Sequence, residues 1–249
     1  MKKLRIQLNN VSVNYGKIHA LKRLYFSIEE GDYIGIIGPN GGGKTTLIKA
    51  ILGLIKPNEG TIDYCGQTLK KSQIRMGYAP QITDINRNFP ITVGEVVLTG
   101  RLNKKIIPFF KYSEADYKIV DEVLETVGLI GLKNRQINEL SGGEFQKMII
   151  ARALTLEPDI LLLDEPTAMV DVMSQRQIFT LIKKLSKNMT ILLITHHVQI
   201  ISKQVKKLIY LDRNIIAEGD PNQVYQYAYI RPVHQNIKRQ AKGSSKTNV

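Results

Sequence analysis

Residues 33–46 read Tyr33-Ile34-Gly35-Ile36-Ile37-Gly38-Pro39-Asn40-Gly41-Gly42-Gly43-Lys44-Thr45-Thr46. From Gly38 onward the stretch matches the pattern G-x-x-x-x-G-K-[ST], whose glycines let backbone N–H groups surround phosphate oxygens. Lys44 can reach the β- and γ-phosphates, and the Thr45 hydroxyl can ligate Mg²⁺. An apolar helical stripe follows, so the sequence predicts a strand, a phosphate-binding loop and a helix in succession. A glycine-rich turn that binds nothing is the alternative, and this context disfavours it.

Three further short runs, mostly apolar, alternate with helical patterns, at residues 75–80, 160–163 and 191–194. This alternation favours an α/β fold with a mostly parallel sheet, covered on both faces. Polar residues follow where the strands should end, at Gln81, Asp164 and His196. Because ligands bind at the carboxyl edge of such sheets, we expect these side chains and the phosphate-binding loop to form one site.

Two carboxylates follow the third run, as Asp164-Glu165-Pro166. Asp164 is a candidate Mg²⁺ ligand, directly or through water, and Glu165 is the candidate general base for attack of water on a γ-phosphate. The alternative is an ordinary boundary between strand and turn, where such residues are common. The phosphate-binding loop in the same chain favours the functional interpretation.

A second candidate anion site opens a helical pattern, at Leu140-Ser141-Gly142-Gly143-Glu144. Ser141 and Glu144 have the spacing of a capping box, S-x-x-E, which is a purely structural role. Ser141 and the free N–H groups of Gly142 and Gly143 could also face a phosphate. Two glycines at a helix start lower helix propensity, and close approach of a ligand to the backbone would explain them.

Two other regions differ from the parallel core. Residues 6–13 and 60–64 alternate like antiparallel strands with one solvated face. Residues 93–156 are mostly helical by pattern, with apolar stripes that we interpret as core packing.

Composition restricts the class of protein. The chain has 249 residues, a net charge of +13 and one cysteine, Cys65, so it has no intrachain disulfide. Polar residues interrupt the N-terminal stretch and every apolar run is short, which argues against a signal peptide and a membrane span. Residues 231–249 contain no acidic residue, and we expect a disordered, solvated basic tail, with contact to anionic lipid as the alternative.

Together these motifs resemble the nucleotide-binding subunits of ATP-binding cassette (ABC) transporters. Residues 38–45 look like their Walker A loop, residues 140–144 like the signature motif, and residues 160–165 like Walker B with its catalytic glutamate. Residues 168–171 stand at the D-loop position, and Gln81 at the Q-loop. His196 stands at the switch histidine, and Tyr15 resembles the aromatic residue that stacks on adenine. The resemblance covers about Leu4 to Tyr225, with the motifs in family order.

The resemblance implies an α/β P-loop NTPase core with a mostly parallel sheet, an N-terminal antiparallel β subdomain and an inserted α-helical subdomain. A single ABC ATPase domain would span residues 1–228, with the helical subdomain at about 90–156, and residues 229–249 would be the tail. ATP and Mg²⁺ are the implied cofactors. The implied catalytic residues are Glu165, His196, Gln81 and Lys44, and the implied Mg²⁺ ligands are Thr45, Gln81 and Asp164. The implied nucleotide-binding residues are Tyr15, Gly38, Pro39, Asn40, Gly41, Gly42, Gly43, Lys44, Thr45, Thr46, Asp164, Ser141, Gly142, Gly143 and Glu144.

Several residues depart from the family pattern. Glu144 replaces the commoner Gln, and Thr45 replaces the commoner Ser. Met169-Val170 is unusual in the D-loop. His197 follows His196 where Asp is usual, and adjacent histidines on a strand would point to opposite faces, which disfavours a two-His metal site.

In the family, two cassettes form a head-to-tail dimer with ATP between the Walker A loop of one and the signature motif of the other. The resemblance therefore implies a homodimer at the cytoplasmic face of the cell membrane, with separate multi-span permease subunits and, indirectly, a substrate-binding protein. Residues 88–101, where a coupling helix of the permease would dock, resemble importers of zinc and manganese, and more distantly those of iron-siderophores and cobalamin. Packing within the helical subdomain is the alternative, and for residues 106–110 it is favoured over docking.

Other function classes remain open. An importer of iron-siderophore, haem or cobalamin is one alternative, and a soluble cassette such as a scaffold subunit of iron–sulfur cluster assembly is another. Cassettes of this superfamily that act in DNA repair carry a long coiled coil, and this chain has no sustained heptads. Those that act in translation carry two cassettes per chain, and this chain has only one phosphate-binding loop. Nucleic acid is therefore not an expected partner.

Overall fold

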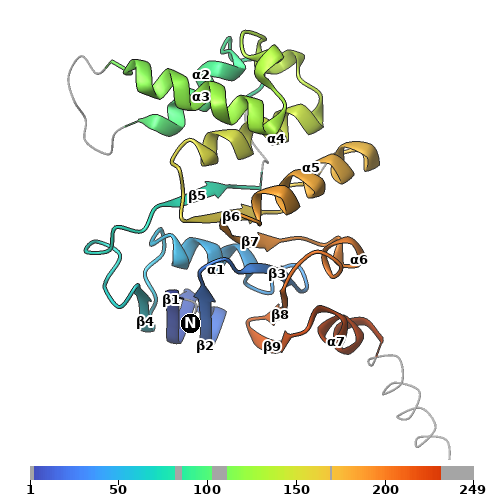
Figure 1. Cartoon of the computed structure of the whole chain (residues 1–249). Helices are drawn as coiled ribbons and strands as arrows, with labels where there is room; N and C mark the ends of the chain where they lie inside the picture. Colours follow the sequence, from blue (N-terminus) through green and yellow to red (C-terminus); the bar gives the residue numbers. More distant parts are fainter. Residues whose placement is uncertain (1–2, 82–85, 103–110, 169, 231–249) are drawn as a thin grey trace, which may run out of the picture.

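The computed structural model describes residues 3–81, 86–102, 111–168 and 170–230 (Figure 1). Two sheets form its framework. A three-stranded antiparallel sheet has the order β2-β1-β4, and a six-stranded sheet has the order β5-β6-β7-β3-β8-β9. In the order of the two sheets, the strands are β2 (Ile18–Glu29), β1 (Leu4–Tyr15), β4 (Glu59–Tyr64), β5 (Met76–Ala79), β6 (Ile160–Asp164), β7 (Thr190–Ile194), β3 (Tyr33–Ile37), β8 (Lys207–Asp212) and β9 (Asn214–Gly219).

The predicted α/β core is confirmed. The four runs identified from the sequence are β3, β5, β6 and β7, and each pairs in parallel with its neighbour in the sheet. β8 extends the parallel set, and β9 is antiparallel to it at the edge. The two alternating stretches are β1 and β4, which pair antiparallel as expected. The sequence analysis assigned no element to β2, β8 or β9.

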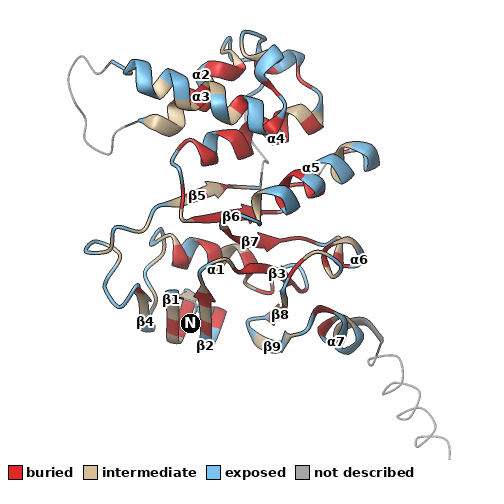
Figure 2. Cartoon of the chain, in the orientation of Figure 1, coloured by how far each residue is buried: buried red, intermediate tan, exposed pale blue. Residues whose placement is uncertain are grey.

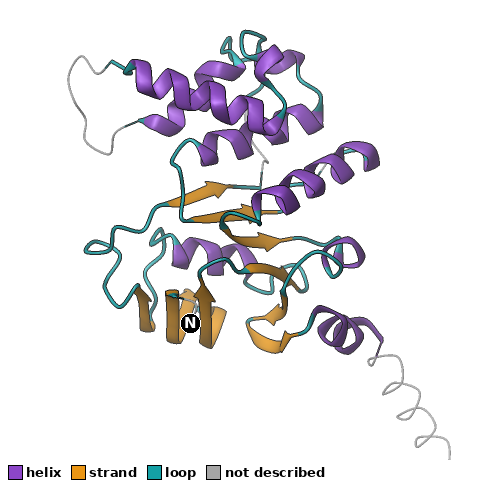
Figure 3. Ribbon diagram, in the orientation of Figure 1, coloured by secondary structure: helices purple, strands orange, loops and turns teal. Residues whose placement is uncertain are grey.

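The helices fall into two groups (Figure 3). One group lies beside the strands: α1 (Lys44–Ile51), α5 (Val172–Leu185), α6 (Val198–Ile201), α7 (Pro221–Tyr225) and the π-helical turn η4 (Gln226–Ile230). The other forms the predicted helical region: α2 (Val93–Leu98), η1 (Thr99–Arg101), α3 (Glu114–Val127), η2 (Ile130–Leu132), η3 (Ile137–Glu139) and α4 (Gly142–Leu154). Within the described residues, no helix has the length and apolar character to cross a membrane.

The core has two parts that meet at the large sheet (Figure 2). Successive residues of β6 point to opposite faces, so Leu161 and Leu163 belong to one part while Ile160 and Leu162 belong to the other. The first part joins the sheet to α5 and the helical region, and the second joins it to α1 and the antiparallel sheet. Both faces of β6 are therefore covered, as its apolar sequence predicts.

The structure corrects one premise and leaves some predictions outside its range. β7 ends at Ile194, so His196 and His197 lie in the loop between β7 and α6 and not on a strand. The argument from opposite strand faces therefore does not apply to them. Residues 106–110 and the tail from residue 231 lie outside the described residues, while 229 and 230 belong to η4.

Candidate functional site

A cavity of about 640 Å³ opens at the carboxyl edge of the parallel strands. That volume is in the range of small-molecule and cofactor sites. The phosphate-binding loop and the start of α1 contribute half of its lining residues, and three residues from other loops complete one side. The lining residues are Tyr15, Ile18, Ala20, Asn40, Gly41, Gly43, Lys44, Thr45, Thr46, Gln81, Glu165 and His196. The sequence predicts that Gln81, Asp164 and His196 meet the loop: Gln81 and His196 line the cavity with it, whereas Asp164 is not among the lining residues and the adjacent Glu165 is.

The loop between β3 and α1 depends on glycine for steric reasons. Gly38 has a φ of 149°, and a Cβ atom there would collide with the carbonyl oxygen of Leu211 at the end of β8. Gly43 has a φ of 91°, and a Cβ atom there would collide with the carbonyl oxygen of Ala20 on β2. Strands distant in the sequence therefore hold the loop on two sides, and only glycine fits both positions.

Lys44 is buried at the start of α1 and turns back over the loop. Its Nζ donates hydrogen bonds to the carbonyl oxygens of Gly38, at 3.1 Å, and Pro39, at 2.8 Å. Burial lowers the pKa of Lys44, while the carboxylates of Glu165 and Asp164 favour its charged form. The ammonium is thus held inside the loop, where a phosphate could replace the weaker carbonyl partners.

Glu165 is held between two side chains. The amide of Gln81 donates to Oε2 of Glu165 at 3.0 Å, and Nε2 of His196 lies 2.6 Å from Oε1. The backbone of Glu165 has a φ of 49°, a left-handed conformation that is uncommon for a residue with a side chain and that clusters at functional sites. The side chain of Glu165 is 17% exposed, so the carboxylate is oriented but still reachable from the cavity.

Asp164 lies beneath Glu165 at the end of β6 and is almost fully buried. Among the described residues, neither of its carboxylate oxygens has a hydrogen-bond partner. Burial raises the pKa of Asp164, although the Thr45 hydroxyl and the Lys44 ammonium nearby favour its charged form. A buried carboxylate without a partner beside a threonine hydroxyl is a donor set that suits Mg²⁺, which prefers oxygen ligands.

Tyr78 is a neighbour of Asp164 that the sequence analysis did not identify. It lies on β5 and pairs in register with Leu162 of β6. Asp164 follows Leu162 by two residues on β6, so the side chains of Tyr78 and Asp164 lie on the same face of the sheet. Burial raises the pKa of Tyr78 to about 12, and the Asp164 carboxylate adds to the shift. No local motif marks such a residue, because its role depends on the pairing of two strands that are distant in the sequence.

Tyr15, Ile18 and Ala20 line the cavity from the end of β1 and the start of β2. Tyr15 is 49% exposed, so its ring is accessible for stacking. Ile18 and Ala20 were not predicted from the sequence. Stacking of Tyr15 on an adenine stays a prediction.

Ser141 and its neighbours do not line this cavity, and they open α4 in the helical region. The predicted capping box is confirmed: Ser141 Oγ accepts from the N–H of Glu144 at 3.3 Å, and Glu144 Oε2 accepts from the N–H of Ser141 at 2.9 Å. These hydrogen bonds lower the pKa of Glu144. Glu144 is therefore occupied within its own helix, as its capping spacing predicts.

Gly143 has a packing role that sequence reasoning missed. A Cβ atom there would lie 2.6 Å from both Cβ and Oγ of Ser174 in α5. The absence of a side chain at Gly143 is therefore explained inside the chain, and ligand approach is not required to account for it.

The ABC transporter family profile matches residues 21–168. A probable ABC transporter ATP-binding protein of Cyanophora paradoxa is 44% identical over 193 residues, covering 78% of this chain and 79% of that protein. The zinc uptake system ATP-binding protein ZurA of Listeria monocytogenes is 38% identical over 232 residues, covering 91% of this chain and 90% of that protein.

Solved structures agree with this assignment. The ADP conformation of an ATP-binding cassette of an ABC transporter has a TM-score of 0.81 at 27% identity, covering 93% of this chain and 98% of that one. A dimeric bacterial ABC transporter cassette has a TM-score of 0.71 at 30% identity, covering 87% of this chain and 98% of that one. The chain described here belongs to the ABC transporter family and is an ATP-hydrolysing, nucleotide-binding subunit of that family.

Proposed function

We propose that this chain is the motor subunit of a membrane importer for zinc or manganese ions, and that it hydrolyses ATP in the cavity beside Lys44. The observation that carries the motor assignment is the carboxylate of Glu165, held between Gln81 and His196 next to the phosphate-binding loop. The cargo assignment rests on similarity to the zinc uptake system ATP-binding protein of Listeria monocytogenes.

In this proposal the nucleotide binds with its phosphates in the loop. Lys44 exchanges its carbonyl partners for β- and γ-phosphate oxygens, and the N–H groups of the loop surround the same oxygens. Tyr15, which lines the cavity and is half exposed, covers the adenine. The remaining loop residues that would contact the nucleotide are Gly38, Pro39, Asn40, Gly41, Gly42, Gly43, Thr45 and Thr46.

Thr45, Gln81 and Asp164 would hold Mg²⁺, since Thr45 and Gln81 line the cavity, Asp164 lies beside Thr45, and the Asp164 carboxylate lacks a hydrogen-bond partner in the described structure. The bound ion would neutralise charge on the β- and γ-phosphate oxygens. Glu165 accepts a proton from the attacking water while the bond between the γ-phosphorus and the bridging oxygen breaks, which leaves ADP and inorganic phosphate. His196 orients Glu165 through its Nε2 contact.

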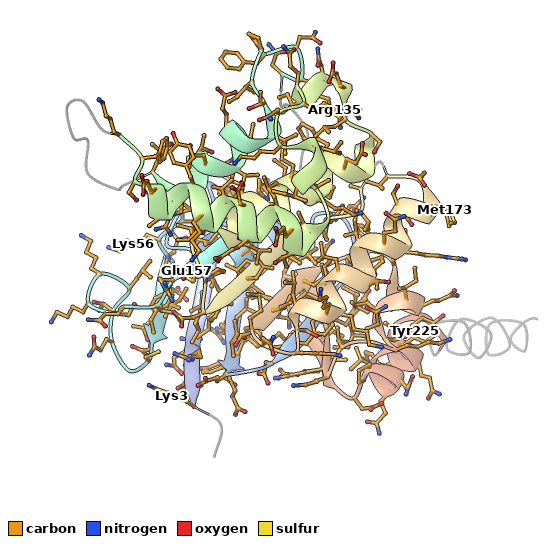
Figure 4. The ribbon with its side chains drawn as sticks, turned by 45° about the horizontal axis from the view of Figure 1, so that its top comes forward. Lys3, Lys56, Arg135, Glu157, Met173 and Tyr225 are labelled. Carbon is orange, nitrogen blue, oxygen red and sulfur yellow. The ribbon has the colours of Figure 1, made fainter. Side chains whose placement is uncertain are left out.

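The second phosphate contact comes from another copy of the chain. Ser141 and Gly143 lie outside the cavity of their own subunit, so in the head-to-tail dimer they would face the γ-phosphate bound by the partner. The similarity to a dimeric bacterial cassette supports a dimer of this chain. Val172 and Met173, directly after the D-loop position, are 64% and 66% exposed, and Met173 projects outward from α5 (Figure 4). Apolar side chains exposed next to the motif are consistent with burial against a partner.

The transport path itself would belong to other polypeptides. A coupling helix of a multi-span permease would dock at residues 88–101, and a substrate-binding protein would deliver the ion from the opposite side of the membrane. This places the chain on the cytoplasmic face of the cell membrane as a peripheral subunit. Uptake of radioactive zinc by the reconstituted complex tests the cargo.

Glu165→Gln tests the motor assignment. We expect ATP to remain bound and a stable ATP-dependent dimer to form, while turnover falls roughly 10²–10⁴-fold, the usual contribution of a general base. Phosphate release and sedimentation in the presence of ATP provide the two measurements. Glu125→Gln, an exposed residue of α3, is the matched control and should keep normal turnover. Unchanged turnover in Glu165→Gln would refute the assignment of the base.

A further inference from the structure

The segment that follows Gln81 lies against the residues that lead into α4. Two backbone hydrogen bonds join these segments. The N–H of Val93 donates to the carbonyl oxygen of Arg135 at 3.0 Å, and the N–H of Ile137 donates to the carbonyl oxygen of Ile91 at 3.1 Å. The segment around Ile91 and Val93 is therefore attached to the segment of the same chain that leads to Ser141.

A tight turn fixes the start of this segment. The N–H of Asn88 donates to Oδ1 of Asn86 at 3.0 Å, and the N–H of Phe89 donates to the carbonyl oxygen of Asn86 at 3.3 Å. Arg87 lies in this turn, and its guanidinium carbon is 4.2 Å from the centroid of the Phe145 ring. This distance is well inside the range of a cation–π interaction, which is about 6 Å.

Phe145 belongs to the first turn of α4. Its N–H donates to the carbonyl oxygen of Ser141 at 2.9 Å, and its ring is 1% exposed because it packs in the core of the helical region. The capping box of Ser141 and Glu144 immediately precedes it. The ring and the capping box are thus parts of one rigid turn, and Arg87 lies over that turn.

We propose that Arg87 is a positioning residue for the Ser141 turn, which it holds through the Phe145 ring in the orientation that meets the partner's nucleotide. The inference rests on the proposed dimer, and it assigns to Arg87 no contact with ATP. Arg87 acts on the second phosphate site and leaves the cavity beside Lys44 unaffected, because it is not among the residues that line that cavity.

The test uses the Glu165→Gln protein as parent, in which the ATP-dependent dimer accumulates. Arg87→Gln removes the cation, Phe145→Leu removes the aromatic ring but keeps an apolar side chain, and Arg87→Lys keeps a cation. Arg152→Gln is the matched control, since it removes an exposed arginine from the last turn of the same helix. Sedimentation gives the ATP concentration at which half of the protein is dimeric, and a fluorescent ADP analogue gives nucleotide affinity of the monomer.

We expect Arg87→Gln and Phe145→Leu each to raise the half-dimer ATP concentration about two- to fivefold, the effect of a cation–π contact at an accessible site. The double variant should show no larger shift than either single variant, and Arg87→Lys should recover part of the loss. Affinity for the ADP analogue should stay unchanged in all of them, and Arg152→Gln should match the parent.

Other outcomes overturn the inference. A shift in Arg87→Gln without one in Phe145→Leu would mean that Arg87 acts on the phosphate directly, and additive shifts would mean that the two residues act separately. Loss of ADP affinity in Arg87→Gln would show a defect in the cavity itself. A parent that stays monomeric at saturating ATP would reject the proposed dimer, whereas a parent that dimerises while Arg87→Gln behaves identically rejects only the role of Arg87.

Discussion

Gly143 combines two demands on one residue. Its missing side chain makes room for Ser174, so α4 and α5 approach closely at this point. The same glycine stands in the first turn of α4, where the proposed partner nucleotide would bind. The packing demand acts in every copy of the folded chain, with or without ATP, and it can therefore be measured alone.

Gly143→Ala should destabilise the nucleotide-free protein. We expect the cost of overpacking, ~1–3 kcal/mol, to exceed the gain of at most ~1 kcal/mol that Ala has over Gly in a helix. In a Ser174→Gly background the contact atoms are gone, so the same substitution should become neutral or stabilising. Urea unfolding of the four proteins gives the coupling energy directly. An equal cost in both backgrounds would contradict the packing role.

The sequence predicts most residues of the site but not their neighbours. Lys44, Glu165 and His196 follow strand ends or belong to a motif, and the edge of a parallel sheet brings strand ends together. The pairing of Gly143 with Ser174, and the position of Tyr78 beside Asp164, depend on contacts between distant segments. No spacing rule within one segment encodes such contacts.

At the scale of elements, capping boxes begin three helices of the described helical region. Thr92 with Glu95 starts α2, Ser113 with Asp116 starts α3, and Ser141 with Glu144 starts α4. In each box the hydrogen bonds lower the pKa of the carboxyl group. Asp116 is the strongest case, because it also accepts from Nε of Arg101 at 2.8 Å.

Asp116→Asn should make the stability of the protein less sensitive to acid. The side-chain hydrogen bond from Arg101, followed by those from Ser113, lowers the pKa of Asp116 from 3.8 to about 2. A depressed folded-state pKa contributes stability that is fully present above the unfolded value and is lost as the pH falls through the folded value. We expect a cost of roughly 1 kcal/mol near pH 6, reduced by solvent screening, that shrinks between pH 4 and about pH 2.

Urea unfolding across this pH range checks the expected effect of Asp116→Asn. Glu122→Gln provides the control, since its pair with Lys118 is exposed along the surface of α3 and should contribute only tenths of a kcal/mol. A cost of Asp116→Asn that stays constant from pH 6 to pH 2 would show that the charge is not what stabilises the turn.

Two of the strands that the sequence analysis missed, β2 and β9, have weak local patterns, whereas β8 is a mostly buried apolar run. β2 carries a charged pair in its middle, and Arg23 there has a φ of 49°, which interrupts the alternation of buried and exposed residues. β9 lies at the sheet edge and has no fully buried residue. Such strands are defined by the partner they pair with, and a period of two in the sequence cannot reveal them.

At the scale of the whole molecule, the two parts of the core share the large sheet, and the cavity lies at its carboxyl edge. The helical region packs on the sheet through the first part, and β1 and β2 reach the cavity from the second. Among the described residues that line the cavity, all come from β1, β2, α1 and the loops at the edge of the large sheet, and none comes from the helical region. Ser141 remains outside the cavity, which is the reason that a second copy is needed in the proposed cycle.

The cargo can be decided only with the complete transporter, because in the proposed arrangement this subunit never contacts the ion. We expect vesicles that contain the complex with its permease and substrate-binding protein to take up radioactive zinc in the presence of ATP. Unlabelled zinc or manganese should compete, while iron-siderophore and cobalamin should not. Glu165→Gln should abolish uptake with assembly intact, and Glu125→Gln should transport normally. Uptake of an iron chelate in preference to zinc would reassign the cargo, and purification with only soluble partners would replace transport with a role such as cluster assembly.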